Sequence, residues 1–341
     1  MRTRRTGRRG SLTDNRQPTT GNCSPRSGRR SFLAWAAASA ATVWLGGRSS
    51  AAEPRAAGDL HPVRLGGPIF NAPGDPEGLA LAHKKAGYRA AYCPNVSLGD
   101  SRRIGDVARA FAKHDVLLAE VGRWCNLLDV DAAKRAANLK NVTEGLALAD
   151  EIGALCCVDI AGSYNPTVWY GPHPDNLSPK FFDAAVENAR KIIDAVQPKR
   201  AKFTYEVMGW AVPDGADSYL ALVKAVDRPA FGVHLDPCNA VNSPAHFYHN
   251  AELLDELFDK LGPWIVSCHA KDLAWDIEMN VHFREVLPGT GKLDYATYLR
   301  RLAALPRDVP LMMEHLKTAA EYEQAGRYIM ETGRKAGVRF E

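Results

Sequence analysis

Short apolar segments that alternate with longer stretches of helical periodicity constrain the fold of this chain more than any other feature. The segments that read as strands are residues 63–68, 88–93, 116–121, 155–160, 201–206, 230–236, 264–270 and 309–314. Such alternation is typical of βα units and a parallel sheet. Eight units in one segment favour a closed barrel over an open sheet, and such barrels run to about 250 residues as one domain. The sequence therefore predicts an α/β fold, a single (β/α)₈ TIM barrel.

The stretches between these segments carry apolar residues at helical spacing. In residues 178–196, for example, Phe181, Ala185, Ala189 and Ile192 recur every three or four positions, which predicts a helix with one buried face. Pro and Gly cluster after the fourth and the seventh predicted strands, at residues 162–176 and 287–294. We expect these two loops to be long enough to shape a pocket.

The first fifty residues form a different kind of segment. Arg29 and Arg30 stand before an apolar run at residues 32–45, and Ser50-Ala51-Ala52 offers small residues for cleavage. This resembles a twin-arginine export signal, although Gly28 and Ala34 depart from the usual pattern. The resemblance implies export through the twin-arginine translocase to the periplasm or beyond. The run is shorter than the roughly 20 residues that span a bilayer, so we expect no stable membrane span after cleavage. The predicted domains are a leader at 1–52, a linker at 53–61 and the barrel at 62–341.

The distribution of charge argues against a nucleic-acid partner. Of the formal net charge of +4, residues 1–52 contribute +9, which leaves about −5 for the rest of the chain. The predicted barrel therefore has no excess of basic residues for a phosphate backbone. Six cysteines fall within the predicted barrel, most of them in apolar segments and none in a CxxC pair. We expect them to be free and buried, which excludes a thiolate zinc or redox site.

Four consecutive predicted strands, the fifth to the eighth, end in polar residues, namely Glu206, Asp236, His269 and Glu314. The active sites of such barrels lie at the carboxyl ends of the strands. Three carboxylates and an imidazole would crowd there, and a divalent metal is the simplest compensation for their charge. This ligand set suits manganese first, with magnesium, cobalt and zinc as alternatives.

Motifs around these four residues resemble a known family. After the fifth-strand Glu come DP-x-N at 236–239, H-x-KD at 269–272, PGTGKLDY at 288–295 and Glu-His at 314–315. Together they are similar to the sugar phosphate isomerase/epimerase family of the xylose isomerase-like TIM-barrel superfamily. The resemblance implies that Glu206, Asp236, His269 and Glu314 bind one divalent metal, and that Glu206 and Glu314 are also the catalytic acid and base.

Differences from two related subfamilies narrow the range of expected activities. Ketose 3-epimerases have His at the position of Asn239 and Glu at the position of Pro213, so the standard pocket of those enzymes is not expected. Endonuclease IV needs His at the ends of the second and third strands, where this chain has residues 93–95 and Glu120-Val121-Gly122. A trinuclear zinc nuclease is therefore excluded.

Further residues near the predicted strand ends are candidates for substrate binding. They are His234, Trp210, Lys271, Arg284 and His173. Three of them have an alternative structural role: His234 as a hydrogen-bonded core residue, Lys271 as the partner of Asp272, and Trp210 as part of an aromatic rim.

The function expected from these residues is metal-dependent isomerisation or epimerisation of a sugar, polyol or keto-sugar. A metal that binds a carbonyl and the adjacent hydroxyl acidifies the C–H bond, and a carboxylate can then move the proton. The same residues permit a lyase or dehydratase acting on a keto-sugar or glycoside. A non-catalytic sugar-binding barrel and metal-dependent hydrolysis remain as further alternatives. We expect an unphosphorylated substrate, and the sequence is compatible with a homo-oligomer.

Overall fold

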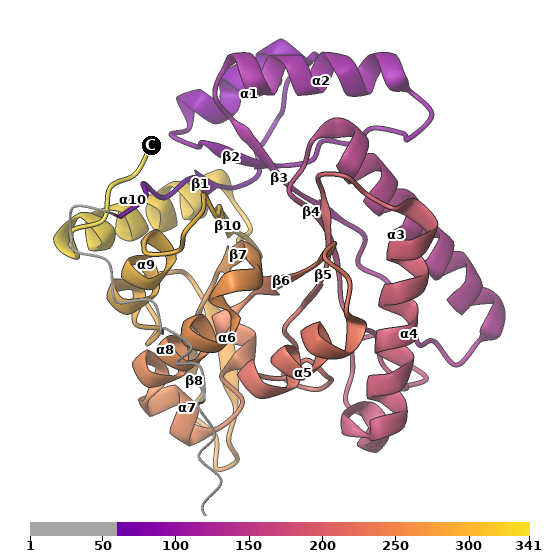
Figure 1. The fold of residues 1–341 in the computed structure, drawn as a ribbon. Coiled ribbons are helices and arrows are strands. Elements are labelled where there is room, and N and C mark those ends of the chain that lie inside the picture. Colours follow the sequence, from indigo (N-terminus) through magenta and orange to yellow (C-terminus); the bar gives the residue numbers. More distant parts are fainter. Residues whose placement is uncertain (1–59) are drawn as a thin grey trace, which may run out of the picture. The chain divides into compact units, whose positions relative to one another are not determined.

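The computed structural model describes residues 60–341, so the predicted leader lies outside the described residues. Eight parallel strands close into one barrel in the order β1-β10-β7-β6-β5-β4-β3-β2, which confirms the predicted fold. Figure 1 shows the helices arranged around these strands. The barrel strands are β1 (Leu65–Gly66), β2 (Ala90–Tyr92), β3 (Leu117–Gly122), β4 (Cys156–Asp159), β5 (Lys202–Glu206), β6 (Phe231–Leu235), β7 (Ile265–Ala270) and β10 (Leu311–Met313).

Helices connect successive strands of the barrel, and a last helix, α10, follows β10. They are α1 (Pro76–Lys85), α2 (Ser101–Lys113), α3 (Ala132–Ile152), α4 (Pro179–Val196), α5 (Ala216–Val226), α6 (Pro237–Ala240), α7 (Pro244–Tyr248), α8 (Asn250–Leu261), α9 (Tyr295–Ala303) and α10 (Ala319–Lys335), with 3₁₀ turns η1 (Pro174–Leu177) and η2 (Gly262–Trp264). Among residues 60–341, no helix has the length and apolar character needed to cross a membrane.

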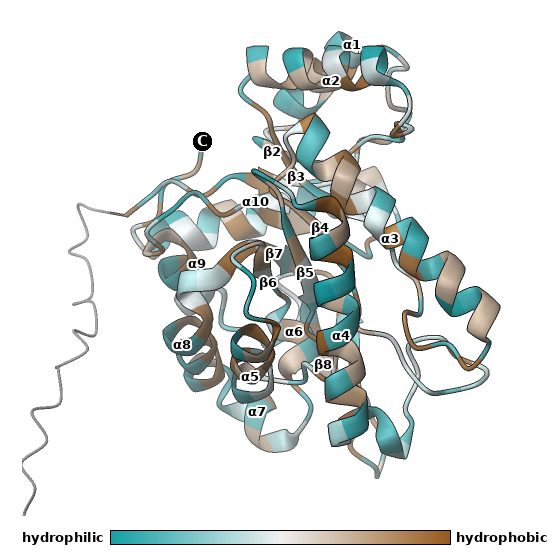
Figure 2. Ribbon diagram, turned by 45° about the vertical axis from the view of Figure 1, so that its right-hand side comes forward, coloured by the Kyte–Doolittle hydropathy of each residue, from teal (hydrophilic) through white to brown (hydrophobic). Residues whose placement is uncertain are grey.

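Helix α4 illustrates how the sequence specifies these outer elements. The Ser178 hydroxyl accepts the backbone N–H of Phe181 at 3.2 Å, and Pro179 occupies the first turn, where its missing N–H costs nothing. Phe181 and Ile192 are fully buried on the face toward the strands, and burial of side chains of this size is worth about 1.5–3 kcal/mol each. The helix ends at Gln197, which has φ of 49°. In Figure 2, hydrophobic and hydrophilic residues alternate around α3 and α4, as expected for helices with one buried face.

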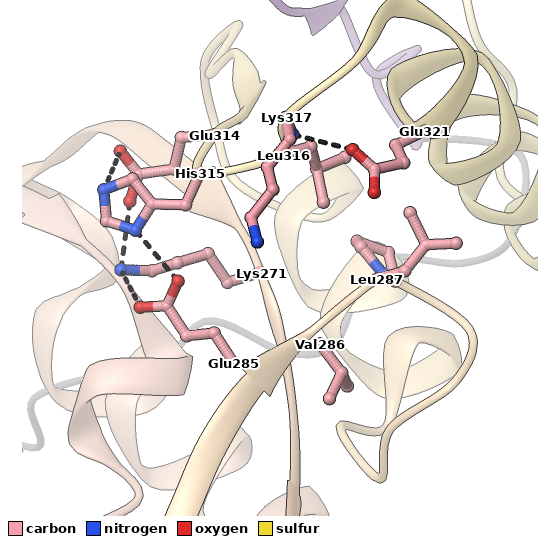
Figure 3. A pocket seen from close by; sticks show the side chains of 10 residues that line it. Lys271, Glu285, Val286, Leu287, Glu314, His315, Leu316, Lys317 and Glu321 are labelled. Atoms are coloured by element: carbon pink, nitrogen blue, oxygen red, sulfur yellow. Dashed lines mark hydrogen bonds and ion pairs between the residues drawn. The ribbon is translucent and has the colours of Figure 1, made fainter.

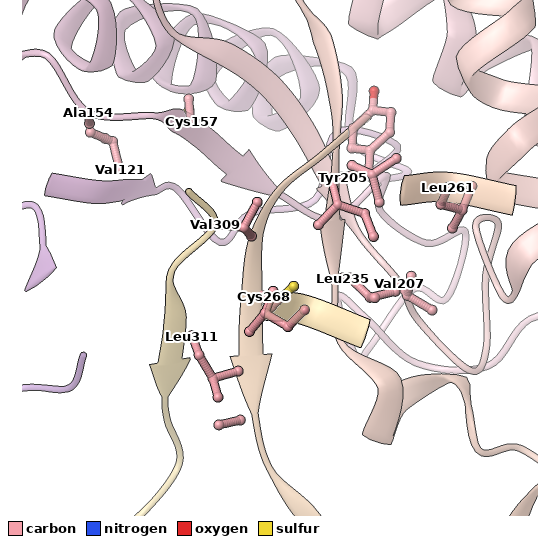
Figure 4. Close-up of a cluster of buried hydrophobic side chains, with 14 of the residues drawn as sticks. Val121, Ala154, Cys157, Tyr205, Val207, Leu235, Leu261, Cys268, Val309 and Leu311 are labelled. Atoms are coloured by element: carbon pink, nitrogen blue, oxygen red, sulfur yellow. The ribbon is translucent and has the colours of Figure 1, made fainter. Parts of the chain in front are cut away.

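Strand alternation separates an apolar outer layer, which faces the helices, from the interior of the barrel. Residues such as Tyr205, Leu235 and Cys268 face the helices and belong to the main hydrophobic cluster (Figure 4). Their neighbours in the chain therefore point into the barrel. At the β1 side of the barrel the space is narrow, because a Cβ on Gly66 would lie 2.6 Å from both the carbonyl oxygen of Ala90 and the sulfur of Met312.

A hairpin after β7 is an addition that the sequence pattern does not predict. It consists of β8 (Asp272–Trp275) and β9 (Phe283–Val286), which pair antiparallel. The Phe283 ring stacks on that of Phe247 in α7 with centroids 4.8 Å apart. The Asp272 carboxylate accepts backbone N–H groups from Gly289, Gly291 and Leu293 at 3.0 Å each. This carboxylate therefore holds the Gly-rich loop against the end of β7.

Candidate metal centre

Four polar side chains meet inside the barrel at the carboxyl ends of its strands. Glu206 is the last residue of β5, Asp236 and Glu314 directly follow β6 and β10, and His269 lies near the end of β7. Side chains two residues apart on a strand lie on the same face. Each of these four residues is two positions from a residue that points into the barrel, so all four point into the same interior space. One ligand atom from each of the four lies within 4.8 Å of all the others. The structure thus brings together the four residues that the sequence predicts as ligands.

The Nδ1 atom of His269 is at the centre of this group. It lies 3.0 Å from Oε1 of Glu314, 3.1 Å from Oε1 of Glu206 and 3.7 Å from Oδ2 of Asp236. Oε1 of Glu314 and Oδ2 of Asp236 are buried and accept no well-formed hydrogen bond. Buried carboxylates are costly unless positive charge compensates them, and these three share the single ammonium of Lys271. Three carboxylates and one imidazole nitrogen are also a donor set that hard divalent cations prefer, so the residues present fit a metal.

The other oxygen of Asp236 has a structural role. Asp236 is the N-cap of α6, and its Oδ1 accepts the backbone N–H of Asn239 at 3.1 Å. This bond orients the carboxylate so that Oδ2 faces the interior. The Asn239 amide donates to Oε1 of Glu206 at 3.1 Å and accepts from the ammonium of Lys271 at 3.0 Å. Asn239, at the position where ketose 3-epimerases have His, therefore links the fifth-strand glutamate to Lys271.

Lys271 brings a positive charge close to all three carboxylates. Its ammonium lies 2.8 Å from Oδ2 of Asp236, 3.0 Å from Oε1 of Glu314 and 3.9 Å from Oε1 of Glu206, and the side chain is only 4% exposed. The alternative partner, Asp272, is occupied by backbone N–H groups of the Gly-rich loop. Lys271 is therefore a member of the cluster and not half of a local pair with its neighbour.

Burial and neighbouring charges shift the pKa values of the two glutamates in opposite directions. Burial raises the pKa of Glu206, and the nearby His269 and Lys271 offset only part of the rise. Burial also raises the pKa of Glu314, but His269 and Lys271 outweigh it and lower this pKa to about 2. Burial lowers the pKa of His269, yet the surrounding carboxylates of Glu314 and Glu120 raise it well above its ordinary value. A pair of carboxyl groups with diverging pKa values is suited to one acid and one base.

A cavity of about 200 Å³ adjoins the cluster (Figure 3). Lys271, Glu314, Glu285 and His315 line its polar side. Glu285 lies 3.4 Å from the Lys271 ammonium, and its other oxygen lies 2.9 Å from Nδ1 of His315. The apolar side consists of Val286, Leu287, Pro288 and Leu316, with Lys317 and Glu321 at the margin.

The structure places the other predicted substrate-binding residues away from this cavity. The side chain of Arg284 is 59% exposed and pairs with Asp276 on the hairpin. His173 and Trp210 line a separate groove of about 490 Å³ between the loops that follow β4 and β5, and Trp210 is 62% exposed. His234 is fully buried, and its Nε2 lies 2.7 Å from Oε2 of Glu120.

Sequence reasoning missed two residues next to the cluster. One is Glu120, in β3, whose Oε1 lies 3.2 Å from Nε2 of His269. The sequence carried one indication of its role: Glu120 is a single carboxylate in an apolar strand, and a buried carboxylate needs a partner. Trp124, in the loop after β3, places its ring centroid 6.2 Å from that of His269 and is partly exposed. No pattern in the sequence connected this tryptophan with the seventh strand.

Known proteins share both the family pattern and the fold of this chain. A family model described as xylose isomerase-like TIM barrel matches residues 82–332. No curated protein matches the chain. Solved structures of several proteins have the same fold at low sequence identity.

One of these structures is a xylose isomerase-like TIM barrel protein from Mycobacterium smegmatis in complex with magnesium, with 18% identity, a TM-score of 0.56, and coverage of 83% of this chain and 100% of that one. Another is L-ribulose 3-epimerase, with 15% identity, a TM-score of 0.60, and coverage of 80% of this chain and 95% of that one. A third is 3-keto-D-glucoside 4-epimerase from E. coli, with 14% identity, a TM-score of 0.56, and coverage of 79% of this chain and 99% of that one. At these identities the likeness concerns the fold.

Proposed function

The chain belongs to the xylose isomerase-like TIM barrel family, and from this membership we propose that it is a divalent-metal-dependent isomerase or epimerase of a sugar, polyol or keto-sugar. The observation that carries the proposal is the convergence of Glu206, Asp236, His269 and Glu314, whose three carboxylates share a single lysine ammonium. The sugar epimerases among the structural neighbours support the substrate class. The magnesium complex of another neighbour supports a divalent metal.

The proposed metal is manganese, with magnesium, cobalt and zinc as alternatives. When bound, it would polarise a substrate carbonyl and acidify the C–H bond of the adjacent carbon that bears a hydroxyl. Glu206 and Glu314, Asp236 and Nδ1 of His269 would supply its ligands.

The two glutamates would move the proton. They stand on β5 and after β10, so they approach the interior from different strands of the barrel. One carboxylate removes the proton from carbon, and the other carboxyl group delivers a proton to the opposite face, or to the neighbouring carbon while the hydroxyl proton passes to the former carbonyl oxygen. The first outcome is epimerisation and the second is isomerisation. The cavity of about 200 Å³ beside Glu314 would accept the part of the substrate that does not react.

Deuterium exchange tests this proposal. The metal-loaded protein is incubated in deuterated water with a panel of aldoses, ketoses, 3-keto-glucosides and cyclitols, and products are analysed by NMR and mass spectrometry. The proposal predicts carbon-bound deuterium in an epimer or isomer, and loss of this exchange in Glu206→Gln. Release of a leaving group with an unsaturated product would replace the proposal with lyase chemistry. Saturable sugar binding without exchange would replace it with a sugar-binding barrel.

We also propose that the protein is exported in its folded state through the twin-arginine translocase. The support is Arg29-Arg30 before the apolar run 32–45. Export after folding would let the metal bind in the cytoplasm, before zinc and copper can compete. Fractionation of cells that express the full chain and an Arg29→Lys, Arg30→Lys variant tests this. We expect the wild-type protein outside the cytoplasm and the variant inside it, and equal retention of both would contradict export by this route.

A further inference from the structure

A second group of buried polar residues lies directly behind the proposed metal ligands. It consists of Glu120, His234 and His269, and the first two of these residues have no part in the proposed chemistry. Glu120 is only 1% exposed and belongs to β3, whereas the two histidines belong to β6 and β7. In the barrel order, two strands separate β3 from β6. The Glu120 side chain therefore reaches across the interior of the barrel.

Each oxygen of Glu120 contacts a different imidazole. Oε2 lies 2.7 Å from Nε2 of His234, and Oε1 lies 3.2 Å from Nε2 of His269. A carboxylate placed between two ring nitrogens accepts a hydrogen bond at each oxygen, so both Nε2 atoms carry a hydrogen.

This arrangement determines which nitrogen of His269 is available to a metal. Because Nε2 donates to Glu120, the lone pair of a neutral His269 is on Nδ1. Nδ1 is the atom that lies 3.0–3.7 Å from the three carboxylates of the metal centre. The His234 ring meets the His269 ring edge-on, with centroids 4.1 Å apart and an interplanar angle of 75°. His234 thus both packs against His269 and occupies the second oxygen of Glu120.

We propose that Glu120 is a positioning residue, which fixes the Nε2–H tautomer of His269 and so presents Nδ1 to the metal, while His234 holds Glu120 in place. This inference rests on the proposed metal dependence and adds to it a residue from the opposite side of the barrel. It also assigns His234 to the support of a ligand, and not to contact with substrate. Carboxylate partners of metal-binding histidines typically contribute 10- to 100-fold to metal affinity.

A Glu120→Gln variant tests the tautomer directly. The Gln carbonyl oxygen can accept from one imidazole only, and its NH₂ group faces the other, which must then present a lone pair. If that imidazole is His269, its hydrogen moves to Nδ1 and blocks the metal; in the other orientation His269 still loses the negative charge of its carboxylate partner and becomes a weaker ligand. We therefore expect the affinity for Mn²⁺ to fall by about 10- to 100-fold, measured by titration of the metal-stripped protein.

Two matched variants separate positioning from general damage to the core. Asp159→Asn neutralises another fully buried carboxylate at the end of the adjacent β4, and we expect its Mn²⁺ affinity to stay within about 3-fold of wild type. His234→Gln keeps an N–H donor for Oε2 of Glu120, so we expect a loss of less than 10-fold. The proposal would be overturned if Glu120→Gln bound Mn²⁺ as tightly as wild type, or if Asp159→Asn lost as much Mn²⁺ affinity as Glu120→Gln.

A measurement on the wild-type protein keeps the proposal testable even if Glu120→Gln does not fold. The chain is labelled with ¹⁵N-histidine and loaded with diamagnetic Zn²⁺, and long-range ¹H–¹⁵N spectra report which nitrogen binds the metal. We expect Nδ1 of His269 to bind Zn²⁺ while Nε2 carries a hydrogen-bonded proton. Ligation through Nε2 would overturn the proposal.

The stoichiometry separates this inference from the proposed function. One Mn²⁺ per chain is expected. Two per chain, with the second lost in His234→Gln, would make Glu120 and His234 ligands of their own metal and overturn the positioning role alone. Absence of metal binding by the wild-type protein would overturn the proposed function together with it.

Discussion

The ammonium of Lys271 lies 2.8 Å from Oδ2 of Asp236, although both side chains are buried in the interior of the barrel. The same Asp236 oxygen is one of the proposed metal ligands. Lys271 therefore stabilises a cluster of carboxylates that would otherwise repel one another, and it also adds positive charge beside the position of a divalent cation. The charge of Lys271 therefore stabilises the metal-free protein and lowers the affinity of the site for a divalent metal.

Replacement of Lys271 separates the two effects. In Lys271→Met we expect the metal-free protein to lose about 3–5 kcal/mol of unfolding free energy, because a buried charge pair is broken. We expect its Mn²⁺ affinity to rise, because a repelling charge has been removed. Denaturant unfolding and metal titration measure the two quantities. Lys317→Met, at the margin of the same cavity, is the control and should change neither; a fall in Mn²⁺ affinity of Lys271→Met would contradict this account.

The proton-transfer roles of the glutamates predict a specific kinetic defect. In Glu206→Gln, we expect kcat to fall by about 10²- to 10⁴-fold, because a Gln amide cannot exchange a proton with carbon. Once a substrate is identified, steady-state kinetics at saturating metal measure this loss. A variant that retains more than a tenth of wild-type kcat would show that Glu206 is a ligand without a role in proton transfer.

Metal binding should release protons. The surrounding carboxylates raise the pKa of His269 well above its ordinary value in the metal-free protein, so Nδ1 carries a proton near neutral pH. A metal can bind this nitrogen only after that proton leaves, and the apparent affinity should therefore increase with pH. Calorimetric titration in buffers of different ionisation enthalpy should give a release of about one proton or more per metal. A pH-independent affinity without proton release would contradict the ligand role of His269.

Asp159 predicts a different dependence on pH. Burial raises the pKa of this carboxyl group to about 7, although backbone N–H groups of Cys125 and Ile160 oppose the rise. Since the folded pKa exceeds the ordinary value of 3.8, the stability of the folded protein falls as the pH rises between these values, and the penalty is absent below them.

Asp159→Asn removes this penalty. Its amide oxygen can still accept both N–H groups, each of which lies 2.9 Å from Oδ1 of Asp159. We expect the variant to be more stable than wild type above pH 7 by on the order of a few kcal/mol, with the difference shrinking toward pH 4. Thermal unfolding between pH 4 and pH 9 measures this, and a variant less stable than wild type at pH 8 would contradict it.

The sequence predicted the barrel closely because apolar strand runs and helical periodicity both persist through the chain. The predicted strand 201–206, for example, corresponds to β5 at Lys202–Glu206. The hairpin β8–β9 was missed because its strands are only four residues long and lack the alternation of a half-buried strand. Its presence moves Arg284 toward solvent and brings Glu285 to the cluster.

The four strand-end residues were found because parallel strands of a barrel deliver their last side chains to one place. Glu120 was not found, since its partners are 114 and 149 residues away in the chain. Strand alternation predicts that such a residue faces inward, but it does not predict which residues stand opposite across the barrel. The tautomer of His269 depends on that cross-barrel contact, so it required the structure.

The central claim is that Glu206, Asp236, His269 and Glu314 bind one divalent metal, and its most direct test is elemental analysis of the purified, folded protein beside a Glu314→Gln variant. We predict about one equivalent of manganese, magnesium, cobalt or zinc per wild-type chain, with loss or clear weakening of metal binding in the variant. A wild-type protein without metal, unable to take up Mn²⁺ after purification and unchanged by the substitution, would contradict the account.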